Sequence, residues 1–400
     1  MTQLRYAQRG TKQSLRARND VLVLQAVAAG AGELARTDIA LRTGLPAATV
    51  SAIVDTLLKR RLIRQVGPGD SRGGKPRMLL ALSDHHQFIG VHVGSSTIAA
   101  SRLTLSGHTV RSVDGVPHHG ADVVAAVGAA VRQLSGPREG VVASIGVALP
   151  GIVDSDGVIR EAVNYGWRMM PFARQLSADC GGASVHVVND ANAVALSEFA
   201  LSSQPSATVA LVWIGTGIGA GIVLDGRLYT GTEFRAGEIG HVDTGLSLRC
   251  RCGRVGCLET VSSLPSMVGD AGDDAIARYL DGADDAAARG LRERVGRAAR
   301  ELARLLSLLA ASLDVTEFVV GGPVVGHPLG PPFLRTTNEA LAIRPMPGFP
   351  AVTLRFSTLG EHSSVLGAAA HAIRQELGVM LTMPAGATSH ATTPLSSAPR

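Results

Sequence analysis

Residues 238–259 read EIGHVDTGLSLRCRCGRVGCLE, and they carry the densest chemistry in the chain. Three of the four cysteines lie here within eight positions, and a histidine precedes them. Cysteine and histidine at this spacing form the ligand set of a closed tetrahedral zinc site, because the flanking glycines let three thiolates turn toward one ion. The sequence therefore predicts a structural zinc without an open position for a catalytic water, with the ligands His241, Cys250, Cys252 and Cys257.

Two other states of these thiols are compatible with the residues alone. The cysteines can be free thiols in a buried core, or two of them can form a disulfide that leaves one thiol over. The clustering of cysteine with histidine at ligand spacing favours zinc over both alternatives.

The same stretch resembles the signature of the ROK family, a group of sugar kinases and sugar-responsive repressors built on the actin-like ATPase (ribonuclease H-like) fold. Every fixed position of the family's Cys-x-Cys-Gly-x-x-Gly-Cys-x-Glu motif is present. The resemblance implies that the zinc loop shapes a sugar pocket in which Glu238, His241 and Glu259 bind hydroxyl groups. His241 can serve both sites, because an imidazole that binds zinc through one nitrogen has its other ring nitrogen free.

A second part of the resemblance lies at Asn189 and Asp190, where a predicted strand meets a predicted helix. They match the family's sugar-binding asparagine and its catalytic aspartate, the general base that takes a proton from the attacked sugar hydroxyl. From the residues alone, Asp190 is equally a helix N-cap, and the two roles are compatible.

The nucleotide side departs from the family pattern. The second of the family's two phosphate-holding glycine turns matches Gly215–Gly221, which alone is a weak signal. Where ROK kinases have Asp-x-Gly-Gly-Thr in the first turn, residues 92–96 read His-Val-Gly-Ser-Ser. An imidazole at His92 cannot replace a carboxylate beside magnesium, which prefers oxygen ligands. We therefore expect no enzyme, with Asp190 as a vestigial base; an active ATP-dependent sugar kinase is the alternative.

The net charge of +5 is unevenly distributed along the chain. Residues 1–84 hold 14 Lys and Arg against 6 Asp and Glu, whereas the remaining residues hold 24 against 27. A basic N-terminal module on a mildly acidic body indicates that the module alone binds nucleic acid.

Apolar periodicity in this module predicts a helix-turn-helix. We expect helices over 20–29 and 37–42, with Thr37 as an N-cap, and a third helix after Pro46. The open face of the third helix has small residues that let the backbone approach a major groove, so Thr49 and Ser51 are the expected base-contacting residues.

Short strands over 64–66 and 78–82 flank a loop rich in Gly and Pro, which predicts a wing. Its cations can bind phosphates or a minor groove. A packing subdomain and a solvated hairpin are the alternatives, and the charge asymmetry favours DNA binding. The expected wing contacts are Arg72, Lys75 and Arg77.

After residue 85, strands alternate with helices, which predicts a mixed α/β sheet. Strand, turn, strand patterns over 88–105 and 208–224 suggest one hairpin in each half of a duplicated fold. The predicted fold class is α/β, with a winged helix-turn-helix over 1–84 and a two-lobed ROK domain over 85–378. Residues 379–400 are Ala-, Ser-, Thr- and Pro-rich, and we expect a disordered tail.

The predicted partners follow from these parts. We expect operator DNA, a sugar or sugar-phosphate effector, and a homodimer or dimer of dimers that pairs its DNA-binding modules on a palindromic site. The absence of a membrane span or signal peptide, and few cysteines, predict a cytoplasmic protein without membrane contact. A zinc knuckle for protein interaction is a further alternative, but it would not need Glu238 and Glu259.

Overall fold

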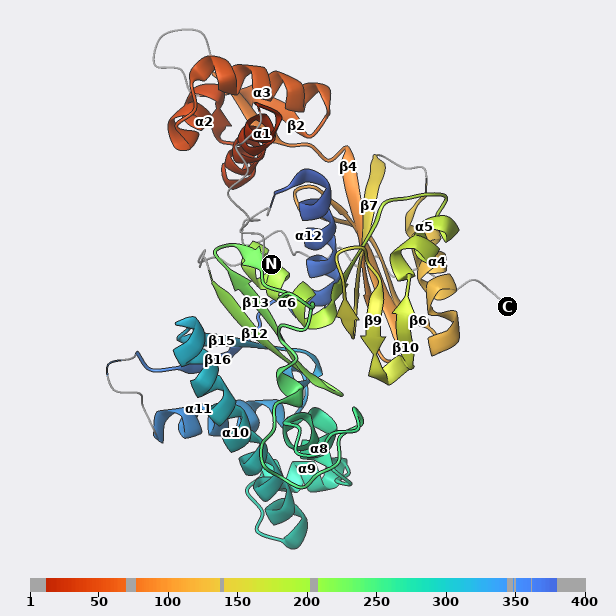
Figure 1. The fold of residues 1–400 in the computed structure, drawn as a ribbon. Coiled ribbons are helices and arrows are strands. Elements are labelled where there is room, and N and C mark those ends of the chain that lie inside the picture. Colours follow the sequence, from red (N-terminus) through yellow and green to blue (C-terminus); the bar gives the residue numbers. More distant parts are fainter. Residues whose placement is uncertain are drawn as a thin grey trace, which may run out of the picture.

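The computed structural model describes residues 12–69, 77–136, 140–201, 208–343, 348, 350–360 and 362–379. In these residues the chain forms an N-terminal head, a first lobe and a second lobe, which Figure 1 colours from red through yellow to blue. None of the helices in this described part is long and apolar enough to cross a membrane.

The head, residues 12–82, is a winged helix-turn-helix, as predicted. In α3, the buried residues Val50, Ile53, Val54 and Leu57 have the spacing of one helix face. The sheet of the head has the strand order β1-β3-β2. The elements are α1 (Lys12–Ala29), β1 (Leu34–Ala35), α2 (Arg36–Thr43), α3 (Ala47–Lys59), β2 (Ile63–Pro68) and β3 (Met78–Leu82).

Two details of the head differ from the prediction. The first helix begins at Lys12 rather than at Asp20. Thr37 does not cap α2, because the helix already begins at Arg36 and its N-cap residue is Ala35. The carboxylate of Asp38 accepts the N–H of Ala35 at 2.9 Å. A carboxylate in the first turn also interacts favourably with the helix dipole.

The two lobes contain five-stranded sheets with the same topology. In the first, β4, β5 and β6 are antiparallel neighbours, and β7 and β11 continue in parallel beyond β4. The second repeats this arrangement with β12, β13 and β14, followed by β15 and β16. The identical strand order confirms the duplicated actin-like fold.

The sheets and their covering elements have the following bounds. The first-lobe strands are β4 (His86–Val93), β5 (Thr97–Thr104), β6 (Thr109–Pro117), β7 (Val141–Leu149) and β11 (Val185–Asn189), with β8 (Ile152–Val153), β9 (Ile159–Ala162) and β10 (Trp167–Met170) in a small separate sheet. The second-lobe strands are β12 (Val209–Ile214), β13 (Ile218–Leu224), β14 (Arg227–Leu228), β15 (Glu317–Gly321) and β16 (Thr353–Phe356). The helices of the lobes are α4 (Val123–Leu134), α5 (Phe172–Asp179), α6 (Asp190–Leu201), α7 (Glu259–Ser262), α8 (Leu264–Val268), α9 (Asp273–Leu280), α10 (Ala286–Leu313), α11 (Gly330–Ile343) and α12 (Ser363–Leu377).

The last helix of each lobe packs against the sheet of the other lobe. α6 follows β11 of the first sheet but packs mainly on β12 and β13, whereas α12 follows β16 of the second sheet but packs on β4 and β7. The two helices also pack against each other, and Figure 1 shows α12 beside the first sheet and below the head. This exchange joins the lobes through one helix pair.

Glycines allow these helices to approach the sheets and each other closely. A Cβ at Gly146 would overlap the carbonyl oxygen of Ala368, and one at Gly367 would overlap that of Ala193. Gly221 meets the carbonyl of Ala191 in the same way. This corrects the predicted glycine turn, which spans only residues 215–217, because β13 already begins at residue 218. Gly221 therefore permits helix packing within a strand.

The head shares a buried core with the first lobe and α12. Val23 and Val27 of α1 belong to the same apolar cluster as Phe88 of β4 and Ile373 of α12. Val379 is fully buried in this cluster, so packed chain extends one residue into the stretch predicted as a disordered tail. Residues 380–400 lie outside the described residues, as do Arg72 and Lys75 of the predicted wing.

Replacing Gly146 with Ala tests the close approach between β7 and α12. The added methyl group would force the helix away from the sheet, and overpacking of this kind costs about 1–3 kcal/mol. Gly326→Ala is the matched control, because Gly326 has a φ of −89° and open space around its Cα. Chemical denaturation should show Gly146→Ala destabilised and Gly326→Ala near wild type; equal stability of the two variants would refute tight packing.

Candidate functional site

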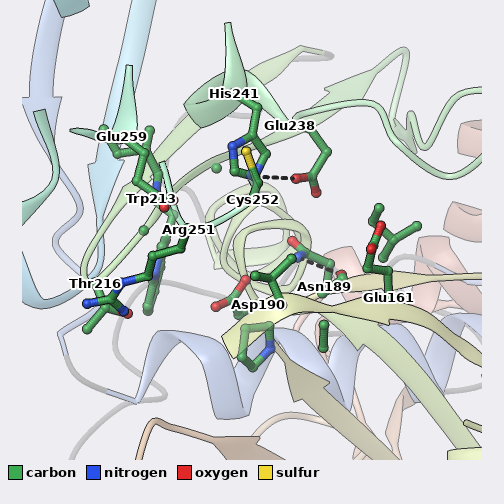
Figure 2. Close-up of a pocket in the computed structure, with 18 of the residues that line it drawn as sticks. Glu161, Asn189, Asp190, Trp213, Thr216, Glu238, His241, Arg251, Cys252 and Glu259 are labelled. Carbon is green, nitrogen blue, oxygen red and sulfur yellow. Dashed lines mark hydrogen bonds and ion pairs between the residues drawn. The ribbon is translucent and has the colours of Figure 1, made fainter. Parts of the chain in front are cut away.

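A cavity of about 630 Å³ between the two lobes collects the predicted sugar-binding residues. The first lobe and α6 contribute Asn189 and Asp190, and the second lobe contributes Glu238, His241 and Glu259. Figure 2 shows these five side chains around one space. The structure therefore brings together residues that are up to 70 positions apart in the sequence.

The strand-to-helix junction fixes the first pair. The side-chain N–H of Asn189 donates to the carbonyl of Gly151 at 3.1 Å, and its oxygen accepts the N–H of Asn192 at 3.2 Å. The carboxylate of Asp190 accepts the N–H of Ala191 at 2.8 Å. Asn189 therefore caps α6, because its oxygen accepts the N–H three residues further on. Asp190 is the first residue of the helix and lines the cavity, so the N-cap role expected for Asp190 is wrong.

Burial changes the acidity of two cavity carboxyl groups. It raises the pKa of Asp190 to about 6, and the negative charge of Glu238 adds to that shift. Burial also raises the pKa of Glu238. Carboxyl groups that protonate this readily can both accept and donate hydrogen bonds, which suits hydroxyl ligands.

The predicted metal ligands form one cluster. The ligand atoms of His241, Cys250, Cys252 and Cys257 all lie within 4.8 Å of one another. Cys252 Sγ is 3.7 Å from Cys257 Sγ, and Cys250 Sγ is 3.9 Å from Nδ1 of the histidine. Zn–S bonds of about 2.3 Å and Zn–N bonds of about 2.0 Å in a tetrahedron imply separations of about 3.5–3.8 Å between the ligand atoms. The donor set can therefore hold a metal ion of this kind.

The disulfide alternative does not fit the distance between the thiols. All four cysteines of the chain are free, and a separation of 3.7 Å is far from the S–S bond length of about 2.05 Å. Burial, together with the two neighbouring thiols, raises the pKa of Cys257 to about 12. Three thiolates at this position therefore require a cation.

His241 and Glu259 connect the metal cluster to the cavity. Nε2 of His241 lies 3.9 Å from a carboxylate oxygen of Glu238, while Nδ1 faces the thiols. One oxygen of Glu259 lies 3.8 Å from Cys250 Sγ, and the other accepts the N–H of Ile218 at 3.2 Å. A metal ion would thus fix the orientation of two residues that line the cavity.

His92 lies at the end of β4, where the kinase pattern requires a carboxylate. Its ring meets Trp213 of the second lobe edge-on, with 6.1 Å between the ring centroids. Burial lowers the pKa of His92 to about 4, so its imidazole is neutral at pH 7. A neutral ring in an aromatic contact offers no oxygen ligand to magnesium.

Sequence reasoning did not identify several other residues that line the cavity. Arg251 and Arg254 lie between the predicted metal ligands, and this placement could have identified them as cavity residues from the sequence. Arg235 lies just before Glu238 in the sequence, and the others come from distant loops and strands without a local signal. The additional lining residues include Glu161, Tyr165, Trp213, Arg235, Arg251 and Arg254.

The predicted DNA-contacting face of the head is only partly open. Thr49 and Ser51 are half-exposed on α3. Arg77, at the base of the predicted wing, pairs with Asp38 at 2.8 Å, so the head itself partly neutralises this cation. Arg36, which the sequence did not single out, lies against α3, where it pairs with Asp55 and donates to the carbonyl of Ser51.

The raised pKa of Asp190 predicts how stability depends on pH. The ionised form of Asp190 is disfavoured in the folded state. The free energy of unfolding of the wild-type protein therefore falls as the pH rises from about 4 to about 6. Asp190→Asn keeps the hydrogen bond to Ala191 and removes the charge. The advantage of the variant in unfolding free energy should grow by roughly 2 kcal/mol between pH 4.5 and pH 8. The same change at the exposed Asp122 is the control; a pH-independent difference for Asp190→Asn would contradict the assignment.

Comparison with known proteins assigns both parts of the chain. The ROK family model matches residues 88–375, and the IclR helix-turn-helix domain model matches residues 21–67. Glucokinase of Halalkalibacterium halodurans is 31% identical over 311 residues, covering 70% of this chain and 93% of the relative. The xylose repressor of Bacillus subtilis is 28% identical over 239 residues, which cover 58% of this chain and 62% of the repressor.

Two solved structures extend the comparison. A ROK family transcriptional regulator, a homologue of the E. coli Mlc protein, superposes with a TM-score of 0.75 at 24% identity, covering 91% of this chain and 96% of its own. The ROK family glucokinase from Streptomyces griseus, in complex with glucose and AMPPNP, gives a TM-score of 0.60 at 26% identity, covering 71% of this chain and 98% of its own. The regulator thus shares the fold of the head as well as that of the lobes. The chain belongs to the ROK family, and an IclR-type helix-turn-helix domain precedes its ROK domain.

Proposed function

We propose that this protein is a DNA-binding transcriptional regulator, a repressor of carbohydrate-related genes, controlled by a sugar or sugar derivative in the interlobe cavity. The observation that carries the proposal is the core that the helix-turn-helix head shares with α12. A head packed on the same helix that joins the lobes can respond to the state of the cavity. The xylose repressors among the relatives support the same class of function.

The sugar side of the proposal is supported by the cavity chemistry. Asn189, Asp190, Glu238, His241 and Glu259 offer amide, carboxyl and imidazole groups to a ring with several hydroxyls. The volume of about 630 Å³ is within the usual range for small-ligand sites. The effector is a sugar or a sugar phosphate, and the cations among the lining residues are compatible with either.

We also propose that the metal ion is zinc, held by His241, Cys250, Cys252 and Cys257. Four protein ligands leave no open position, so the ion would organise structure and would not activate water. Its role would be to hold Nε2 of His241 and the carboxylate of Glu259 toward the cavity.

Phosphoryl transfer is not part of the proposed function. Its catalysis depends on positioning and on a metal ion that neutralises the phosphates. Without a carboxylate in the first loop, the loss in rate would be roughly a thousandfold or more. Asp190 would then bind sugar without acting as a base.

The route from cavity to head supports a switch. Asp190 begins α6, α6 packs on α12, and the end of α12 reaches the head at Gly378, where a Cβ would lie 3.1 Å from Val21. A sugar that favours one arrangement of the lobes would bias the head through this packing. We propose a cytoplasmic homodimer or dimer of dimers, because paired heads would bind a palindromic operator.

The zinc proposal predicts one zinc per chain in purified protein. Cys252→Ser should lose the metal and lower the melting temperature, because the loop around the cavity depends on the ion. Elemental analysis by mass spectrometry measures the metal, and Cys180→Ser, which changes a cysteine outside the cluster, should retain it. Zinc-free protein after preparation without chelators would rule out the assignment.

The DNA proposal predicts steeply salt-dependent binding. Selection from random duplexes should yield a roughly palindromic site, and fluorescence anisotropy then measures affinity. The double change Arg72→Ala and Lys75→Ala should weaken binding to all duplexes and reduce the salt slope by about 2, whereas changes at Thr49 or Ser51 should alter sequence preference. Arg289→Ala with Arg292→Ala, on α10 of the second lobe, removes the same charge as a control. Equal affinity of the wing variant and the parent at one salt concentration would contradict the wing assignment.

The sensor proposal predicts sugar binding without turnover. A thermal-shift screen should identify a stabilising sugar or sugar phosphate. Incubation of that sugar with the protein, ATP and magnesium should then yield no sugar phosphate above background. Robust turnover that disappears in Asp190→Ala would establish the kinase alternative instead.

A further inference from the structure

A second cavity of about 440 Å³ has its own lining and shares one residue, Asn189, with the sugar cavity. The loop between β8 and β9, strand β11, the segment 228–234 and α12 enclose it, so both lobes contribute to its wall. Asn189 lines both cavities. None of the roles proposed above uses this space.

Asn192 of α6 lines the second cavity with an unsatisfied polar group. The residue is 8% exposed, and its side-chain oxygen is buried without a hydrogen-bond partner among the described residues. A buried acceptor of this kind destabilises the fold unless a donor reaches it. The oxygen is not exposed to the cavity in this arrangement, so a ligand hydroxyl would supply that donor after the amide group turns toward the cavity.

Arg374 of α12 supplies a cation to the same cavity. It is half-buried, and the one hydrogen bond of its side chain among the described residues is a long one of 3.5 Å to the carbonyl of Gly226. Within the described residues, no carboxylate lies within 4 Å of its guanidinium group. Burial, together with the charge of Arg227, lowers the pKa of Arg374. The guanidinium group therefore lacks the anion that usually accompanies a partly buried arginine.

The other ionisable groups of the cavity do not neutralise Arg374. The carboxylate of Asp154 is engaged by Arg160 and by the backbone of its own loop. His186 is paired with Glu376 at 2.9 Å, and burial lowers the pKa of His371 to about 3, so its ring is neutral. Among the lining carboxylates, this leaves Asp156, which is exposed.

We propose that the second cavity binds a small hydroxylated anion, a carboxylate or a phosphate ester, with Arg374 paired to the anionic group and Asn192 accepting a hydrogen bond from a hydroxyl. The site is distinct from the sugar cavity and does not depend on DNA binding. Because α6, α12 and both lobes form its wall, an occupant would contact the same helices that join the lobes.

Isothermal titration calorimetry of the full-length protein tests this site with three probes. D-glycerate and glycerol 3-phosphate present the anion as a carboxylate or as a phosphate ester, and glycerol lacks it. At least one of the anions should bind at millimolar concentration or below, and glycerol should not. The probe that binds more tightly shows whether the cavity prefers a carboxylate or a phosphate ester. Failure of both anions to bind would overturn the proposal.

Variants distinguish the cavity from general attraction to a basic protein. Arg374→Gln should weaken binding of the anion by about tenfold or more, because hydrogen bonds to charged groups are the strong ones. Arg227→Gln removes the same charge from an exposed neighbour that does not line the cavity, and it should change affinity far less. Equal effects of the two variants would refute the site.

Two further measurements keep the test decisive. If Arg374→Gln fails to fold, Asn192→Leu, which removes the buried acceptor at similar volume, should weaken binding instead. Unchanged affinity in the folded Asn192→Leu variant would then refute the site. Loss of binding in Glu238→Gln with retention in Arg374→Gln would assign the anion to the sugar cavity and overturn the proposal.

Discussion

The close packing of α6 on α12 is the contact on which the rest of this structure depends. Small residues, among them Gly367 against the backbone of Ala193, bring the two helices together with little side-chain bulk between them. Because each helix also packs on the sheet of the opposite lobe, the pair sets how the lobes meet. Interfaces packed this tightly tend to have discrete arrangements rather than a continuous range. The cavity between the lobes and the position of the head therefore both depend on the packing of α6 and α12.

The metal cluster supplies the second constraint. The loop after β14 has little regular structure, and its cavity-lining residues would otherwise be free to reorient. Thiols at 3.7 Å, with His241 Nδ1 facing them, would tie this loop to a single ion, and Glu259 links it to the start of β13. With such an ion bound, the second-lobe wall and the first-lobe wall fixed at Asn189 would together form a pre-organised site. Pre-organisation lets the binding energy of a small ligand act on the lobes rather than on loop ordering.

The sequence predicted the parts of this molecule whose signals are local. The cysteine motif, the junction at Asn189, the α3 periodicity and the first-lobe hairpin all depend on neighbouring residues. The strands β6 and β16 and the helix α12 were not predicted. In the case of α12, the helix is rich in alanine and most of its length is buried between other elements, so no polar face marks it in the sequence. Gly221 was predicted to lie in a turn, because a glycine required by close helix packing cannot be distinguished in the sequence from a glycine required by a turn. The second cavity and the pairing of Arg77 with Asp38 arise from tertiary contacts that no local pattern encodes.

The central claim is that sugar binding and DNA binding are coupled through α12. The most direct measurement is the affinity for a selected operator with and without a saturating sugar, together with the affinity for that sugar with and without the operator. The account predicts that sugar changes operator affinity by about tenfold or more, and that the operator changes sugar affinity by the same factor, because coupling free energies are reciprocal. A sugar that binds the interlobe cavity and leaves operator affinity unchanged would contradict the account.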